Sequence, residues 1–135
     1  MDRRQRERRL LQRAIAIFAI VPVAGGLYGV LFGARLTGDI VSVSGDSHYR
    51  YLSGLLLGIG LLFWSAIPAV ETKRGRVQLL TLVVVLGGLG RLCGLLLTGL
   101  PSLPMLGALA MELVVTPLVC LWQVRVARLH EPAGL

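Results

Sequence analysis

The chain has 135 residues, of which 55% are hydrophobic and 16% are charged, with a mean hydropathy of +0.75 and an isoelectric point near 10.7. This composition is too apolar for a water-soluble domain of that length and is typical of helices that pack closely in lipid. The net charge of +7 does not indicate nucleic-acid binding, because the arginine cluster precedes an apolar run without aromatic residues that would stack on bases.

Four apolar stretches follow one another along the chain. Each is long enough to cross a hydrocarbon core of about 30 Å at 1.5 Å per helical residue, and none alternates with the period of a membrane β-strand. Because the connections are short apart from the first, successive helices should be antiparallel neighbours. The sequence therefore predicts an all-α membrane protein that forms one four-helix antiparallel bundle over residues 1–135, with spans at about Ala14–Ala34, Tyr51–Val70, Val77–Thr98 and Met105–Val124.

The orientation follows from the distribution of Lys and Arg. The amino-terminal tail, residues 1–13, carries six arginines, the connection 71–76 carries three cations, and two more follow the last span. The opposite side carries only Arg35 and Arg50. The positive-inside rule therefore predicts that both termini are cytoplasmic.

A secretory signal peptide is the main alternative for the first span. Such peptides also begin with basic residues and an apolar run, and Arg8-Arg9-Leu10-Leu11 faintly resembles a twin-arginine signal. The apolar stretch is longer than the usual 7–15 residues, however, and no small-residue cleavage site follows it. We therefore predict a membrane span.

The first connection, residues 35–50, is predicted to face outward. It contains the alternating run Val41-Ser42-Val43-Ser44, followed by Gly45-Asp46, and this pattern predicts a small strand-and-turn cap. Tyr49 and Tyr51 fall at the expected water boundary, where amphipathic rings are favoured.

One stripe of small or polar residues runs along each predicted helix. In lipid, small residues let helix backbones approach one another, so these stripes are typical of packing seams and do not by themselves indicate a function. The stripes are Pro22, Gly26, Gly29 and Gly33; Tyr51, Gly54, Gly58 and Ser65; Gly87, Arg91, Gly94 and Thr98; and Ala108, Glu112, Thr116 and Gln123.

Two ionisable residues, Arg91 and Glu112, are embedded in the spans. Each costs about 2.5–3.5 kcal/mol at a helix centre when it has no partner. Both lie about seven residues from the turn between the third and fourth spans, so an antiparallel hairpin brings them to the same depth. We predict a bidentate ion pair, which serves either as a clamp that fixes the helix register or as part of a binding site.

Polar residues at the outer ends of the helices favour a binding site. The rim of a pocket above the pair would be formed by Asp46, His48, Arg50, Tyr51 and Thr98. No catalytic residues, metal ligands or cofactor motifs are predicted, and His48 lacks a second ligand at suitable spacing. Cys93 and Cys120 lie at different depths and should not form a disulfide. The candidate ligand-binding residues are Arg50, Tyr51, Arg91, Glu112 and Thr116.

Three segments resemble a bacterial family known as domain of unknown function 4345. They are His48-Tyr49-Arg50-Tyr51-Leu52-Ser53-Gly54, Gly87-Gly88-Leu89-Gly90-Arg91-Leu92-Cys93-Gly94, and Glu112 with Pro117. The resemblance covers nearly the whole chain and implies a small four-helix protein of the bacterial inner membrane. It points to Arg50, Tyr51, Arg91 and Glu112 and implies no activity. The layout also resembles DoxX-type membrane proteins, a likeness of fold alone.

Three functions remain open at this stage. The sequence favours a non-enzymatic protein that binds a small amphiphile or lipid in an outer-leaflet pocket organised by Arg91 and Glu112. The first alternative is a membrane enzyme, either a quinone-linked oxidoreductase or an isomerase that uses Glu112 as an acid or base. The second is a structural or interaction subunit, which could form a homo-oligomer through the glycine stripes. The lipid bilayer is a partner in each case.

Overall fold

A computed structural model describes residues 2–36 and 41–131. In this part of the chain the regular elements are all helical, and four helices are long and apolar enough to cross a membrane. The predicted all-α class with four membrane helices is therefore confirmed. The helices run over Arg3–Phe32, Val43–Ala69, Arg74–Thr98 and Leu103–His130.

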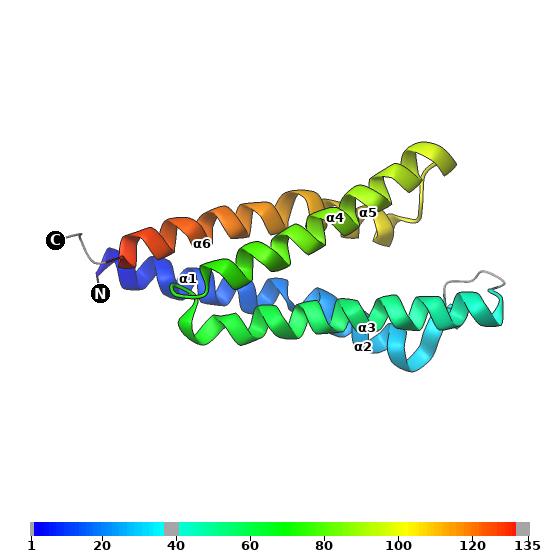
Figure 1. The fold of residues 1–135 in the computed structure, drawn as a ribbon, viewed down its shortest axis with the longest axis horizontal. Helices are drawn as coiled ribbons and strands as arrows, with labels where there is room; N and C mark the ends of the chain where they lie inside the picture. Colours follow the sequence, from blue (N-terminus) through cyan, green and yellow to red (C-terminus); the bar gives the residue numbers. More distant parts are fainter. Residues whose placement is uncertain (1, 37–40, 132–135) are drawn as a thin grey trace. The chain divides into compact units, whose positions relative to one another are not determined.

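Local breaks divide these helices into shorter elements (Figure 1). In chain order they are α1 (Arg3–Phe18), α2 (Ile20–Phe32), η1 (Gly33–Leu36), α3 (Val43–Ala66), η2 (Ile67–Ala69), α4 (Arg74–Thr98), α5 (Leu103–Ala110), η3 (Met111–Val115) and α6 (Thr116–His130). The basic tail is helical from Arg3 onward.

Pro22 accounts for the break between α1 and α2. A proline has no N–H, so the carbonyl of Phe18, four residues earlier, cannot receive its usual helical hydrogen bond. The chain turns at Ala19, whose own carbonyl accepts from the N–H of Val23 at 3.1 Å. Helical bonding therefore resumes within one turn and the long helix continues.

The predicted strand-and-turn cap is wrong over Val43 and Ser44, which belong to α3. Ser42 is the N-cap of this helix, and its hydroxyl accepts the N–H of Gly45 at 3.1 Å. Asp46 lies in the first turn, where the helix dipole favours a negative charge. These capping signals outweigh the alternation of Val and Ser, so residues 43–50 of the expected loop are helical. Residues 37–40 of that loop lie outside the described part of the chain.

The chain divides into two compact units, and each is described by itself. The central unit comprises Arg13–Ile67, and the terminal unit comprises Met1–Gln12 with Pro68–Leu135.

Close contact of α2 with α3 holds the central unit together. A Cβ atom on Gly26 would lie 2.5 Å from the backbone nitrogen of Leu57, and one on Gly29 would overlap the hydroxyl of Ser53. On α3 the contact is made by Gly60, where a Cβ would lie 2.6 Å from the side chain of Val23. The predicted seam on α2 is therefore observed, whereas α3 uses Gly60 at its contact with Val23.

Aromatic side chains continue this packing where α1 meets α3. The rings of Phe18 and Phe63 meet edge to face with centroids 5.3 Å apart. The indole N–H of Trp64 donates to the carbonyl of Ala16 at 3.1 Å.

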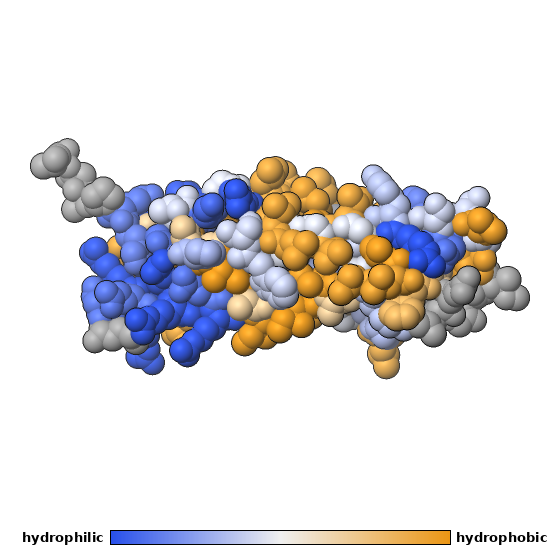
Figure 2. All heavy atoms as spheres, turned by 90° about the horizontal axis from the view of Figure 1, so that it is seen from below, coloured by the Kyte–Doolittle hydropathy of each residue, from blue (hydrophilic) through white to orange (hydrophobic). Residues whose placement is uncertain are grey.

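The terminal unit has a thin apolar interior and an apolar exterior. Val77 on α4 and Val126 on α6 are fully buried, whereas Leu79, Leu86 and Leu121 are exposed. Figure 2 shows one face of the molecule, with hydrophilic side chains gathered at the end where α1 begins and α6 ends and hydrophobic ones next to them. An exterior of this kind suits a hydrocarbon solvent.

The Gly26 contact can be tested by substitution. Gly26→Ala places a methyl group against the backbone of α3 and should lower the free energy of unfolding by about 1–3 kcal/mol. Gly25→Ala is the matched control, because its Cβ would lie 4.0 Å from its nearest neighbour, Leu56. Thermal unfolding in detergent measures both, and an equal melting temperature for the two variants would contradict the packing described.

Candidate functional site

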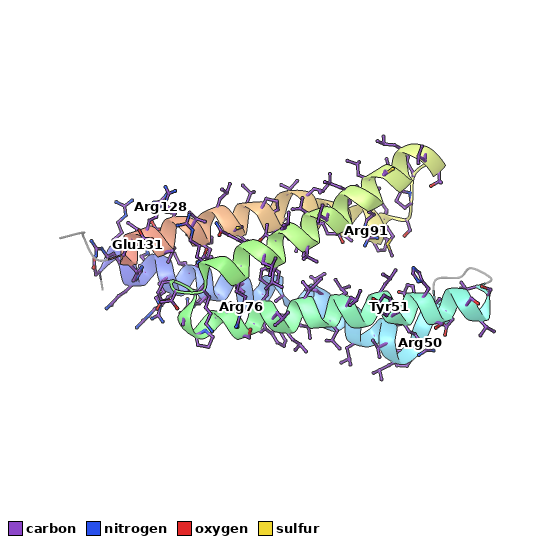
Figure 3. All side chains as sticks on the ribbon, viewed as in Figure 1. Arg50, Tyr51, Arg76, Arg91, Arg128 and Glu131 are labelled. Atoms are coloured by element: carbon purple, nitrogen blue, oxygen red, sulfur yellow. The ribbon has the colours of Figure 1, made fainter. Side chains whose placement is uncertain are left out.

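Arg91 and Glu112 form a bidentate ion pair in the terminal unit. The Nε of Arg91 lies 3.0 Å from Oε2 of Glu112, and Nη2 lies 3.2 Å from Oε1. Arg91, labelled in Figure 3, comes from α4, and Glu112 comes from η3. Their two hydrogen bonds show that the hairpin brings the two residues to one level. Two parallel hydrogen bonds to a planar guanidinium are the strongest arrangement available to such a pair.

The pair is partly shielded and has one further neighbour. The side chain of Glu112 is 17% exposed and that of Arg91 is 36% exposed. The Nη1 of Arg91 also donates to the thioether sulfur of Met105 at 3.0 Å. A guanidinium has five N–H donors, and three of them are engaged among the described residues. Arg91 can therefore donate to an additional acceptor while it stays paired.

The π-helical turn η3 positions Glu112. Pro117 lacks an N–H and cannot donate to the carbonyl of Leu113, so α-helical bonding fails at this point. Thr116 instead donates both its backbone N–H and its hydroxyl to the carbonyl of Met111, five residues earlier, the latter at 2.8 Å. Single π-helical turns within α-helices occur frequently at functional sites.

Gly88 allows α4 to approach η3. A Cβ on Gly88 would lie 2.9 Å from Cβ of Glu112 and 2.7 Å from the side chain of Leu113. Gly88 is three residues before Arg91, on the same side of α4, so the close approach and the ion pair belong to one contact. The predicted seam included Gly87, and the glycine that makes this contact is its neighbour.

Arg50 has a structural role in the central unit. Its Nε donates to Oδ2 of Asp46 at 2.8 Å, and its Nη1 donates to the carbonyls of Val30 and Leu31 at 2.6 and 3.1 Å. Oδ1 of Asp46 accepts the N–H of Ala34 at 2.8 Å. Arg50 and Asp46 thus satisfy backbone groups where α2 ends, which the last turn of a helix cannot do for itself. Their spacing of four residues was the signal in the sequence.

The other predicted site residues differ in their surroundings. Thr116 is buried, and its hydroxyl donates to the carbonyl of Met111. Met111 is the residue before Glu112, so this bond stabilises the turn that carries Glu112. Tyr51 is 63% exposed on α3, with its ring centroid 6.5 Å from that of His48. Arg91, Glu112 and Thr116 therefore belong to the terminal unit, where Arg91 and Glu112 are in contact, and Arg50 and Tyr51 belong to the central unit.

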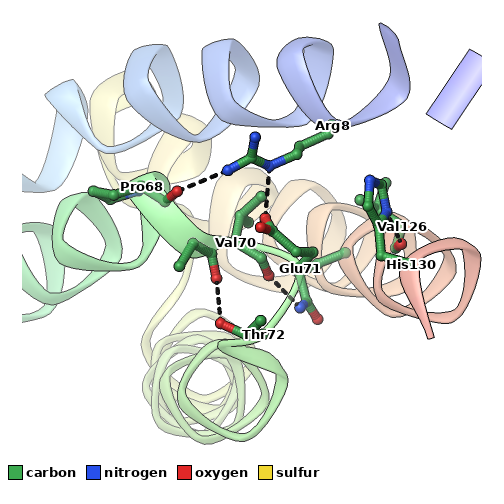
Figure 4. A network of polar contacts seen from close by, with 9 residues as sticks. Arg8, Pro68, Val70, Glu71, Thr72, Val126 and His130 are labelled. Atoms are coloured by element: carbon green, nitrogen blue, oxygen red, sulfur yellow. Dashed lines mark hydrogen bonds and ion pairs between the residues drawn. The ribbon is translucent and has the colours of Figure 1, made fainter. Parts of the chain in front are cut away.

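A second polar network was not anticipated from the sequence (Figure 4). Nε of Arg8 pairs with Oε2 of Glu71 at 2.7 Å, and its Nη2 donates to the carbonyl of Pro68 at 2.9 Å. Nearby, the fully buried Gln123 donates to the carbonyl of Val70 at 2.8 Å. These bonds attach α1 and α6 to the connection between α3 and α4. Glu71, an acidic residue beside three cations in the connection 71–76, was the available signal.

The environment of Glu71 favours its charged form. Partial burial by itself would raise the pKa of Glu71. A backbone hydrogen bond of the same residue, the hydrogen bond from Arg8 and the positive charges of Arg8 and His130 outweigh this effect and lower the pKa below its usual value of 4.5. Glu71 therefore stays ionised and paired well into the acid range.

The two cysteines, Cys93 and Cys120, are both free thiols, as predicted. Among the described residues, no group of three or more His, Cys, Asp or Glu side chains is placed to hold a metal ion.

The fold and this site define a multi-pass helical membrane protein with an arginine–glutamate pair between two of its apolar helices. Residues 10–123 match the family described as Domain of unknown function (DUF4345), and the chain belongs to that family. No curated protein and no solved structure matches the chain. The more distant likeness to DoxX-type proteins stays a prediction.

The Gly88 contact makes a prediction about the ion pair. Gly88→Ala should push η3 away from α4 and lower the free energy of unfolding by about 1–3 kcal/mol, since Cβ of Glu112 and the side chain of Leu113 must shift. Gly87→Ala, one residue away, is the control. If the close approach at Gly88 holds Arg91 and Glu112 together, Glu112→Gln should lower the free energy of unfolding less in the Gly88→Ala background than in the wild type. Equal costs in the two backgrounds would show that Gly88 does not position the pair.

The Glu71 pair makes a prediction about pH. Because the folded-state pKa is lowered, its stabilising effect is present above about pH 4.5 and is lost as the pH falls through the lower, folded-state pKa. Glu71→Gln should be less stable at pH 7, by about 0.2–1 kcal/mol, and should lose less stability on acidification. Melting temperatures from pH 7 to pH 3 measure this, with Glu131→Gln at the exposed end of α6 as the control. Identical profiles for wild type and Glu71→Gln would contradict it.

Proposed function

We propose that the protein is a non-enzymatic membrane protein that binds a small amphiphile or lipid beside Arg91 and Glu112. The proposal rests on the bidentate ion pair between Arg91 and Glu112 on apolar helices. The Arg91 side chain is about one-third exposed, and its guanidinium keeps N–H donors that the described residues do not engage. In a hydrocarbon surrounding, water is not available to satisfy such donors. A polar group on a bound amphiphile would satisfy them.

The charge balance of the site narrows the chemistry of this ligand. Glu112 already neutralises Arg91, and Met105 adds an apolar surface with a polarizable sulfur. An additional anion would leave the site with a net negative charge in a medium of low dielectric constant, which is costly. The polar group that fits best is a neutral acceptor, such as an ester or ketone carbonyl, on a molecule with an apolar tail.

The same proposal includes a position in the membrane. Arg91 and Glu112 lie within helices that qualify as membrane spans, and the cations are concentrated in the tail, in the connection 71–76 and after the last span. The positive-inside rule supports cytoplasmic termini in a bacterial inner membrane, which places the pair toward the outer leaflet. A wholly structural role for the pair is the competing proposal, since a bidentate clamp also fixes helix register.

The binding proposal predicts that purified protein retains an amphiphile. Native mass spectrometry and lipid extraction of wild-type protein should reveal a bound molecule that the Arg91→Leu/Glu112→Leu double variant loses. Replacing both charges with apolar residues is often neutral for folding, so the variant should remain helical. The matched control is Arg8→Leu/Glu71→Leu, which removes a different ion pair of the terminal unit and should keep the ligand.

Two outcomes would overturn the proposal. One is wild-type protein without a retained molecule, and the other is a double variant that retains as much as the wild type. The exchange Arg91→Glu/Glu112→Arg separates the two roles, because a clamp tolerates reversal better than a ligand site. Full stability of the exchanged protein with loss of the ligand supports binding.

A further inference from the structure

A cavity of about 300 Å³ opens in the terminal unit between the start of α1 and the second half of α6. Glu112 and the cavity residue Arg125 are separated by about 20 Å along the last helix, at 1.5 Å per residue, so the cavity is distinct from the Arg91–Glu112 site. Its lining combines three arginines, one glutamate and two apolar side chains: Arg3, Arg6, Glu7, Leu10, Trp122 and Arg125.

The cavity carries an excess of positive charge. Glu7 is its one acidic residue and is already engaged, with Oε1 at 2.9 Å from Nη2 of Arg125 and Oε2 at 3.4 Å from the indole nitrogen of Trp122. Arg3 is 3.9 Å from the same carboxylate and mostly exposed. The guanidinium of Arg6 forms no hydrogen bond or ion pair with any residue in the ranges 2–36 and 41–131. With three guanidinium groups facing one carboxylate, the cavity is complementary to an anion.

The apolar part of the lining distinguishes a lipid from a free anion. Leu10 is 43% exposed, and Trp122 is half-buried with its indole N–H directed to Glu7. An indole with one polar and one apolar edge is typical of the level where lipid headgroups meet acyl chains. A small inorganic anion would leave these apolar surfaces uncovered.

We propose that this cavity binds the headgroup of an anionic phospholipid. The lipid phosphate lies between Arg3 and Arg6 as a charge-assisted acceptor, and an acyl chain runs along Leu10 and Trp122. Basic pockets at the cytoplasmic ends of membrane helices are suited to such headgroups, whose leaflet already attracts polybasic segments. The bound lipid joins the first and last helices, so it stabilises the terminal unit.

Lipid titration of the full-length protein tests this. Wild-type protein in detergent is titrated with phosphatidylglycerol or phosphatidylcholine, and binding is followed by native mass spectrometry and melting temperature. Phosphatidylglycerol should bind and raise the melting temperature, and phosphatidylcholine should not. Arg3→Ala/Arg6→Ala should weaken phosphatidylglycerol binding by about tenfold or more, since the phosphate loses two charge-assisted hydrogen-bonding partners.

The matched control is Arg4→Ala/Arg9→Ala. It removes the same charge from the same helix, but neither residue lines the cavity. This control should keep phosphatidylglycerol affinity within about twofold of the wild type, because salt screens charges that do not contact the phosphate. Equal losses in the two double variants, or equal binding of both lipids, would overturn the proposal and indicate unspecific attraction of charge. Displacement of the lipid by millimolar inorganic phosphate would also overturn it, since it would identify a site for a free anion.

Discussion

In the terminal unit, Arg91 and Glu112 neutralise one another within the apolar stretches of α4 and the last helix. Neither charge is tolerated alone in such a surrounding, so α4 and the last helix must meet where the two side chains can reach one another. The unit meets this requirement with two backbone features. Gly88 removes the side chain that would keep the helices apart, and the π-helical turn η3 aims Glu112 at Arg91. The helix register, the close helix spacing at Gly88 and the π-helical turn η3 therefore all favour the contact between Arg91 and Glu112.

The central unit also contains an arginine that needs partners for its charge and its N–H donors, and it supplies different partners. There the arginine, Arg50, contacts an aspartate of its own helix and the carbonyls at the end of α2, so it completes a helix terminus. Gly33 adopts a φ of 66°, and a Cβ at this position would overlap Asp46, which explains why glycine is needed at the junction. The two arginines differ in their acceptors: Arg50 donates to a carboxylate of its own helix and to two backbone carbonyls, whereas Arg91 donates to the carboxylate of Glu112 and the thioether of Met105.

Composition and hydropathy were sufficient to predict the four helices, because apolar length is read directly from sequence. The Arg91–Glu112 contact was also predictable, since both residues are equally distant from one turn. The sequence could not show that Gly88 rather than Gly87 contacts η3. Adjacent helical positions differ in direction by about 100°, and the position that contacts η3 depends on how η3 bends. A strand was predicted at the start of α3 because Val41–Ser44 alternates like a strand. The competing signal was that Ser42 and Asp46 are residues that favour the start of a helix. Contacts such as Arg8–Glu71, which join residues far apart in sequence, leave no periodic pattern.

The bonds of Glu7 to Trp122 and Arg125 have a consequence for the order of assembly. A membrane helix is delivered to the bilayer as it is synthesised, so α1 arrives before α6 has been made. Until the last helix has been made, Arg3 of the same helix is the available partner of the Glu7 carboxylate, because its contacts with Trp122 and Arg125 require α6. The contact between the first and last helices therefore forms late in biogenesis. The terminal unit is complete only after both ends of the polypeptide have been synthesised.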